Sequence, residues 1–163
     1  MLMLEVDREP FFQGIGPLII PKEKVVTVRP DWTLERALVV LTRHGVSSVP
    51  VISKDERVEG LISKTNILDF LLTANNERIH FENISKRYVA EAMNQNHGGI
   101  MANSMFSFAF EVLIDRPYIP IIDVKNRFLG ILTRKVVMEK VTEYFQKEFM
   151  ERVMIERKQH SHG

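Results

Sequence analysis

The stretches Val49-Pro50-Val51-Ile52 and Gly60-Leu61-Ile62-Ser63 recur later in the chain as Ile119-Pro120-Ile121-Ile122 and Gly130-Ile131-Leu132-Thr133. Both copies are offset by the same 70 residues, counted from position 49 to position 119, so the polar turns between the paired stretches have equal length. Two offsets that agree rarely arise by chance, and a fixed period is typical of a repeated structural unit. The sequence therefore contains two copies of one unit.

The first copy predicts the order β-α-β-β-α. Val25–Val28 is β-branched and predicts a strand that ends before Pro30. Thr33 suits a helix N-cap, and Gly45 suits the left-handed residue just after a helix. Between them, apolar residues at helical spacing predict one buried face, formed by Leu34, Ala37, Leu38 and Leu41. Strands are predicted at 49–52 and 58–62, and a second helix near Thr65.

The second copy repeats this order from Ile100 onward. A helix is predicted over 104–110, strands over 119–122 and 128–132, and a last helix from Arg134. The predicted organisation is an N-terminal segment (1–19), a first repeat (20–73), a linker (74–90), a second repeat (91–146) and a C-terminal extension with a polar tail (147–163). The linker is polar and carries a short apolar clasp, formed by Ile79, Phe81 and Ile84.

The last helix carries an apolar stripe spaced by four residues, which is longer than one small repeat needs to cover its sheet. The stripe consists of Val137, Val141, Phe145, Phe149 and Val153. Two interpretations remain open: the stripe docks a second subunit, or it covers the chain's own sheet while the last turns fray. We predict a homodimer, because exposed apolar stripes of this size usually mark an interface. The tail from Arg157 to Gly163 is expected to be disordered.

Composition excludes several classes of function. With 22 basic and 21 acidic residues, the chain has a formal charge of +1, so no overall field attracts nucleic acid or an anionic membrane. No cysteine is present, which excludes disulfides, thiolate metal sites and cysteine nucleophiles. The apolar runs are too short to span a bilayer, and no secretory signal is visible. These features predict a cytoplasmic protein without membrane or nucleic-acid partners.

The junction Thr133-Arg134-Lys135 is a candidate anion site. It lies where a strand is predicted to turn into a helix, and backbone N–H groups at a helix start favour an anion. Arginine can hold a phosphate with two hydrogen bonds, while lysine adds a point charge and threonine a hydroxyl. Without the repeat these would be two solvated surface charges, but the repeat context favours a phosphate site.

The β-α-β-β-α repeat, with its apolar-Pro-apolar strand and its Gly-x-x-Ser/Thr helix start, resembles the CBS domain, and two in tandem resemble a Bateman module. The resemblance covers about residues 20 to 146. The chain also resembles the stand-alone CBS-pair proteins of Gram-positive bacteria that bind cyclic di-AMP. That resemblance rests on the segments 24–26, 77–79 with 81–82, 91–93 and 130–137.

The resemblance implies an α/β (α+β) fold with two clefts related by a pseudo-twofold axis, and no metal. In each cleft the strand and pre-proline loop of one repeat face the helix start of the other. The first cleft would combine Lys24, Val25, Val26, Val46, Ser47, Ser48, Val49 and Pro50 with Thr133, Arg134 and Lys135. The second would combine Ser63, Thr65 and Asn66 with Ile100, Met101, Ala102, Tyr118, Ile119 and Pro120. For Pro120 a purely structural role is favoured.

The sequence departs from the common CBS pattern three residues after the Ser/Thr of each repeat. Many CBS units carry an acid there that binds ribose hydroxyls, whereas this chain has Asn66 in the first repeat and Val136 in the second. The Arg134 cleft therefore favours phosphates over a simple adenosine, and the Asn66 cleft is more neutral. Lys135 is a further departure if relatives carry a second arginine, because lysine cannot form a bidentate grip.

No catalytic motif is present. The five histidines are scattered, and the pair His160 and His162 provides only two ligands, which cannot define a metal site. We therefore predict a non-enzymatic sensor that binds cyclic di-AMP and regulates a partner protein, which the resemblance suggests is the alarmone synthetase of the stringent response. The alternative is a CBS regulator that binds AMP or ATP and controls an enzyme.

Overall fold

The structure is a computed structural model that describes residues 13–73 and 76–161. It divides into two compact units that do not follow the linear order of the repeats. The β unit comprises residues 20–101 and 119–131, and the α unit comprises 102–118 and 132–163 with the chain up to residue 19. Residues 1–12, 162 and 163 lie outside the described residues, and with them most of the predicted N-terminal segment and His162 of the predicted histidine pair.

Helix α2 (Leu34–Arg43) begins and ends where its capping residues predict. The hydroxyl of Thr33 accepts a hydrogen bond from the backbone N–H of Arg36 at 3.3 Å, and Gly45 takes a φ of +63°. A positive φ carries no steric cost for glycine, so the chain can leave the helix there. The first predicted helix is confirmed.

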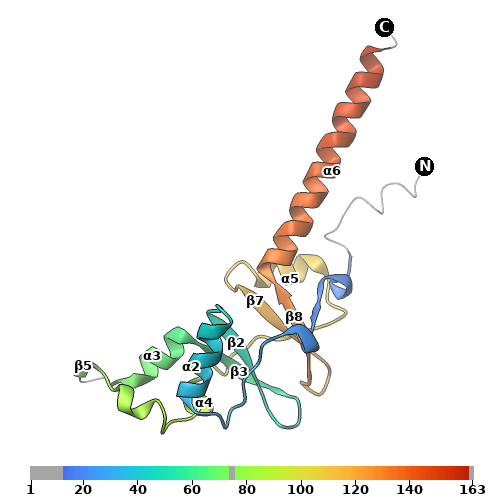
Figure 1. Ribbon diagram of the computed structural model, residues 1–163. Helices are drawn as coiled ribbons and strands as arrows, with labels where there is room; N and C mark the ends of the chain where they lie inside the picture. Colours follow the sequence, from blue (N-terminus) through green and yellow to red (C-terminus); the bar gives the residue numbers. More distant parts are fainter. Residues whose placement is uncertain (1–12, 74–75, 162–163) are drawn as a thin grey trace. The chain divides into compact units, whose positions relative to one another are not determined.

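Strands β2 (Ser48–Ile52) and β3 (Val58–Ser63) form an antiparallel hairpin in which Ser48 lies opposite Ser63. Helix α3 (Lys64–Leu71) follows at once. In Figure 1 this hairpin lies beside α2 and α3, which supply its apolar cover. The two predicted strands and the second predicted helix are confirmed within one or two residues.

The predicted strand at Val25–Val28 is wrong. Residues Lys22–Lys24 form a 3-10 turn (η3), and the N–H of Val25 closes it by donating to the Lys22 carbonyl at 3.1 Å. Only Val28 forms a bridge, parallel to Val51 of β2. The short strand β1 (Ile20–Pro21) instead pairs with β8, which begins at Phe128.

The core of the β unit contains the apolar helix face that the sequence periodicity predicts. Leu34, Ala37 and Leu41 of α2 are fully buried. They belong to a cluster with residues from β2, β3, α3 and the short helix α4 (Val89–Ala92). The other buried members of this cluster are Val28, Val49, Val51, Ile62, Ile67, Leu71 and Val89.

The linker between the repeats contains secondary structure of its own. Strands β4 (Leu72–Thr73) and β5 (Asn76–Ile79) pair, and a 3-10 turn (η4, Phe81–Asn83) precedes α4. Residues 74 and 75 lie outside the described residues. Of the predicted clasp, Ile84 packs against the core, whereas Ile79 and Phe81 are exposed at 38% and 55%. The clasp prediction is therefore correct only for Ile84.

The second repeat supplies β6 (Ile100–Met101), α5 (Phe106–Val112), β7 (Tyr118–Ile122) and β8 (Phe128–Thr133). The strand order β1-β8-β7-β6 makes a four-stranded mixed sheet, in which β6 runs parallel to β7 and β1 antiparallel to β8. The mixed α/β fold predicted from the repeats is confirmed. Helix α5 begins two residues later than predicted.

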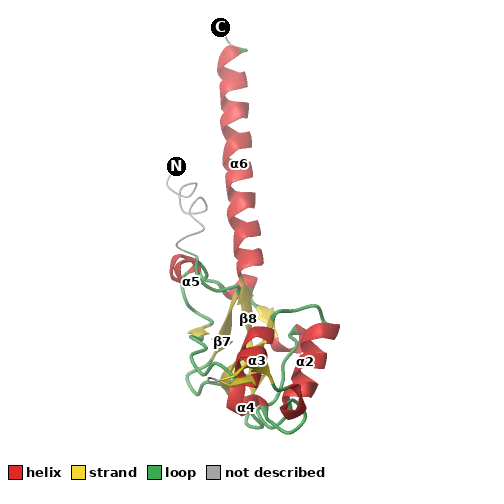
Figure 2. Cartoon of the chain, turned by 90° about the vertical axis from the view of Figure 1, so that its left-hand side faces the viewer, coloured by secondary structure: helices red, strands yellow, loops and turns green. Residues whose placement is uncertain are grey.

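The α unit is built around α6 (Arg134–His160), a helix of 27 residues. The segment that contains the buried residue Ile15 pairs with the chain just before α5, since the Ile15 N–H donates to the Ser104 carbonyl at 3.1 Å and Gly14 forms a bridge with Met105. A short 3-10 turn (η2, Gly16–Leu18) follows. Figure 2 shows α6 as one continuous helix. Its continuation to residue 160 corrects the expected disorder from Arg157. Hydrogen bonds close the last turn, because the Ser161 N–H donates to the Arg157 carbonyl at 3.1 Å and the Ser161 hydroxyl donates to the Lys158 carbonyl at 3.1 Å.

Candidate functional site

The two helices that start after β3 and β8 are built alike. The Thr133 hydroxyl accepts from the Val136 N–H at 3.2 Å, and the Ser63 hydroxyl accepts from the Asn66 N–H at 2.9 Å. In each repeat the first helical N–H also donates to the loop before the preceding strand pair: Arg134 to the Pro117 carbonyl at 2.8 Å, and Lys64 to the Ser47 carbonyl at 3.1 Å. The two repeats of the sequence thus form equivalent hydrogen bonds at the starts of their second helices.

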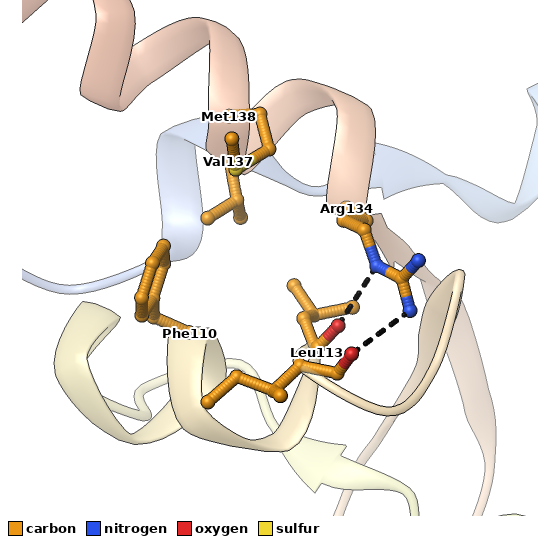
Figure 3. Close-up of a pocket in the computed structure, with 6 residues that line it drawn as sticks. Phe110, Leu113, Arg134, Val137 and Met138 are labelled. Carbon is orange, nitrogen blue, oxygen red and sulfur yellow. Dashed lines mark hydrogen bonds between the residues drawn. The ribbon is translucent and has the colours of Figure 1, made fainter.

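The guanidinium of Arg134 is held by helix α5. Its Nε donates to the Leu113 carbonyl at 2.9 Å, and its Nη2 donates to the Ile114 carbonyl at 3.2 Å (Figure 3). A cation at the last carbonyls of a helix is favourable, because those carbonyls have no partner within the helix. Arg134 therefore stabilises the end of α5 in addition to being a candidate ligand for phosphate.

A pocket of about 230 Å³ lies between α5 and α6, with Arg134 at its edge (Figure 3). Its lining is otherwise apolar and consists of Phe110, Leu113, Ile114, Val137 and Met138. The sequence patterns described above do not predict this pocket. The spacing of Phe106, Phe110 and Leu113 on α5 is the signal that could have indicated an apolar face there.

Lys135 is the more accessible cation at this junction. Its side chain is 83% exposed, and among the described residues it forms one ion pair, a contact of 3.9 Å from Nζ to Glu139 Oε1. Such a distant, exposed pair contributes little to stability. Lys135 is thus available to an anion without loss of a stabilising contact.

At the first-repeat junction, Asn66 is occupied by helix capping. Its Oδ1 accepts from the Ser63 N–H at 3.0 Å and from the Ser63 hydroxyl at 2.8 Å. Together with the bond from the Asn66 N–H, this is a reciprocal capping box. The side chains of Ser63 and Asn66 therefore stabilise the start of α3, and Thr65 beside them is exposed.

The remaining predicted residues of the first cleft lie in the β unit and differ in exposure. Lys24 and Ser47 are exposed, whereas Val49 and Pro50 are buried. The residues between these extremes are half-buried: Val25, Val26, Val46 and Ser48. The Pro50 carbonyl accepts from the Val28 N–H at 3.1 Å, so Pro50 is fixed within the sheet.

The remaining residues of the second cleft are mostly covered. Ile100, Tyr118, Ile119 and Pro120 are buried, Ala102 is half-buried and Met101 is exposed. Each predicted cleft draws residues from both units. The assignment of residues to the two clefts therefore stays a prediction.

Two carboxyl groups have lowered pKa values. A hydrogen bond from His80 is the main cause that lowers the pKa of Glu82. The backbone N–H of Arg127 is the main cause that lowers the pKa of Asp123, with further hydrogen bonds from the Arg127 side chain and the Lys125 N–H. Both groups lie in turns and stabilise them.

Two further properties concern the described residues only. No group of three His, Asp or Glu side chains among them could hold a metal ion. No helix among them combines the length and apolar character needed to cross a membrane.

Comparison with known proteins identifies the family. Residues 18–73 match the CBS domain. Cyclic di-AMP receptor B of Bacillus subtilis is 29% identical over 132 residues, which are 81% of this chain and 88% of the receptor. The crystal structure of the Listeria monocytogenes CbpB protein in complex with c-di-AMP is 32% identical, with a TM-score of 0.75, over 81% of this chain and 97% of that one.

A further relative is an enzyme that is much longer than this chain. Inosine-5'-monophosphate dehydrogenase of Halobacterium salinarum is 27% identical over 139 residues, which are 85% of this chain and 26% of the enzyme. The relatives that this chain covers almost completely include the cyclic di-AMP receptor and the CbpB protein. Because the match to CbpB exceeds 30% identity over nearly its whole length, the chain belongs to the family of CBS-domain proteins, in the CBS-pair form with two repeats in one chain.

Proposed function

We propose that this protein is a cytosolic, non-enzymatic sensor that binds cyclic di-AMP and regulates a partner protein. The observation that carries the proposal is its match, over most of both chains, to a cyclic di-AMP receptor and to a CbpB protein crystallised with c-di-AMP. The cations at the start of α6 support it, because a cyclic dinucleotide presents two anionic phosphodiester groups that they can bind.

In the proposed first cleft, Thr133 and Lys135 would bind a phosphate. The Thr133 hydroxyl oxygen already accepts from Val136, which leaves its proton to donate. Lys135 adds a charge that its weak contact with Glu139 does not neutralise. An adenine would lie against Val26 and Val49, and Lys24 would add a further positive charge.

Arg134 would also bind the phosphate, by giving up its present hydrogen bonds to carbonyl groups. Its Nε and Nη2 now bind the carbonyls of Leu113 and Ile114, so a phosphate on that edge must displace them. The exchange replaces bonds to neutral carbonyls by stronger bonds to a charged oxygen. Nucleotide binding would then release the end of α5 beside the apolar pocket.

A second candidate function is a CBS regulator that binds AMP or ATP and controls an enzyme. The similarity to part of a dehydrogenase supports it, because 85% of this chain matches a stretch that makes up 26% of that enzyme. The second cleft, with Ser63, Thr65 and Asn66 facing Ile100 to Ala102 and Tyr118 to Pro120, would be the site for a neutral nucleoside. The absence of an acid at Asn66 and Val136 favours the first proposal.

We further propose a homodimer formed through the exposed part of the α6 stripe. Val137 is buried within its own unit, but Phe145 and Phe149 are 59% and 66% exposed. Packing against the chain's own fold therefore accounts for Val137 at the start of the stripe but not for Phe145 and Phe149. The regulated partner would be a cytosolic protein, for which the alarmone synthetase of the stringent response is the candidate that the resemblance suggests.

A thermal-shift panel followed by calorimetry tests the ligand. AMP, ADP, ATP, cyclic di-AMP and cyclic di-GMP are compared at equal concentration, because a ligand that binds only the folded state raises the midpoint by mass action. We expect cyclic di-AMP to bind at least tenfold more tightly than AMP. Equal affinities for AMP and cyclic di-AMP would favour the AMP/ATP regulator instead.

A further inference from the structure

The turns of the two hairpins in the β unit, Ser53–Arg57 and Asp123–Arg127, are held together as a symmetric pair. The Val58 N–H donates to the Asn126 carbonyl at 3.1 Å, and the Phe128 N–H donates to the Glu56 carbonyl at 2.7 Å. Between these two bonds, Arg57 and Arg127 form an antiparallel bridge. This bonding pattern makes them a non-hydrogen-bonded pair, the arrangement in which opposite side chains come closest, with Cα atoms about 4.5 Å apart.

Two arginines directly opposite each other repel, and such pairs destabilise a sheet. Both side chains belong to exposed residues, and backbone bonds on either side fix their positions. The two arginine side chains thus leave the backbone at directly opposite positions, from which both can reach neighbouring anionic groups.

The two repeats differ in how they neutralise this pair. Arg127 donates from Nε to Asp123 Oδ2 at 2.7 Å. The position equivalent to Asp123 in the first repeat is Ser53, whose hydroxyl accepts from the Arg57 N–H at 3.2 Å and so closes the same turn without a charge. Arg57 therefore lacks the acid that its counterpart has.

The other acids near Arg57 do not replace the missing one. Glu56 is bound to Lys22, with 3.1 Å between Nζ and Oε1. Asp55 and Glu59, two residues away on either side, form no ion pair with Arg57 in the described part of the chain. One positive charge of the pair is left for an external partner.

We propose that Arg57 and Arg127 form a docking site for an acidic segment of a partner protein, with Arg57 as the principal anchor. The choice of a protein as occupant rests on the proposed regulatory function, since a regulator without catalytic groups must contact its target. Guanidinium groups bind carboxylates with two parallel hydrogen bonds, and two adjacent groups match neighbouring Asp or Glu side chains. The site is separate from the residues proposed to bind nucleotide.

Fluorescence anisotropy with a labelled hexaglutamate peptide tests the site, with a hexaglutamine peptide as the neutral reference. We expect the double variant Arg57→Gln/Arg127→Gln to bind hexaglutamate at least fivefold more weakly than the unmodified protein. The matched control is Arg29→Gln/Arg43→Gln, which removes the same charge from two other exposed positions of the β unit. Equal weakening by the control, or no preference of the unmodified protein for glutamate, would overturn the proposal.

Two further readouts separate docking from folding and from nucleotide binding. Because Arg57 repels Arg127, Arg57→Gln should leave the thermal midpoint unchanged or raise it at low salt. A lowered midpoint would make Arg57 a structural residue and overturn the proposal. Calorimetry with cyclic di-AMP should give the same affinity for the double variant and the unmodified protein. Failure of all variants to bind cyclic di-AMP, with peptide binding intact, would refute the nucleotide proposal alone.

Discussion

Asn126 and Val58 are joined by two hydrogen bonds across the two repeats of the sequence. The Val58 N–H donates to the Asn126 carbonyl at 3.1 Å, and the Asn126 Nδ2 donates to the Val58 carbonyl at 3.0 Å. Asn126 has a φ of +60°, as does Glu56 at the equivalent position of the first repeat. The side chain of Asn126 thus ties the second turn to the first, and its Oδ1 is buried without a partner.

Replacement of Asn126 separates the role of its side chain from that of its backbone. Asn126→Gly keeps the positive φ and removes only the side-chain bond to the Val58 carbonyl, whereas Asn126→Ala removes the same bond and retains a Cβ in the left-handed region. We expect the alanine variant to be less stable than the glycine variant by about 1 kcal/mol, the cost of that conformation. Urea unfolding measures the difference, and equal midpoints would contradict it.

Arg134→Ala should weaken cyclic di-AMP binding about 30-fold, or about 2 kcal/mol, by loss of a charge-assisted contact. The same variant should lower the free energy of unfolding by about 1 kcal/mol, because the Leu113 and Ile114 carbonyls lose their donors. Calorimetry and urea unfolding measure the two effects.

Asn66→Ala is the control for the assignment of the clefts. It should destabilise the start of α3 through loss of the capping box and leave binding of cyclic di-AMP nearly unchanged. If Asn66→Ala abolished binding while Arg134→Ala did not, the first cleft would be the wrong one.

The proposed dimer depends on the exposed aromatic residues of α6. Phe145→Ser/Phe149→Ser should convert a dimer into a monomer at tens of micromolar, because it removes apolar area that only a second copy would bury. Light scattering measures the mass. Val124→Ser, at a position 85% exposed in the second turn, should remain dimeric. A monomeric unmodified protein would refute the proposal.

Asp123 should make stability depend on pH. Because hydrogen bonds lower its pKa in the folded state, its contribution is present above the ordinary Asp value and is lost as the pH falls through the folded value. Asp123→Ser, which copies Ser53, should be less stable than the unmodified protein near neutral pH. The difference should shrink below about pH 4. Urea unfolding at several pH values checks this, and a constant difference would contradict it.

Nucleotide and partner should affect each other's binding by the same factor. If cyclic di-AMP releases the partner, the bound partner must weaken cyclic di-AMP binding equally, and we expect a coupling of about 1 to 3 kcal/mol, or roughly 5- to 150-fold. Calorimetry with a purified alarmone synthetase, and pull-downs with and without cyclic di-AMP, measure it. Identical recovery of partner with the site saturated would refute a ligand-controlled switch.

The sequence by itself determined the repeated elements, because their signals are local. Thr33, Gly45 and the apolar face of Leu34, Ala37 and Leu41 are sufficient to define α2, since capping and periodicity act over a few residues. The common offset of 70 residues likewise indicated the two hairpins and the helices that follow them. The prediction of a strand over Val25–Val28 was wrong, because β-branched residues favour extended backbone but a strand also needs a partner strand. In the structure only Val28 of this segment pairs with one.

Only the tertiary structure decided which groups meet. Arg134 binds the end of α5, about twenty residues earlier in the chain, and Arg57 lies opposite Arg127 across two different hairpins. Neither contact leaves a periodic or capping signal in the sequence, because each depends on how distant segments pack. The same side chains therefore read as surface charges in the sequence, whereas in the structure one holds a helix end and two form an exposed pair.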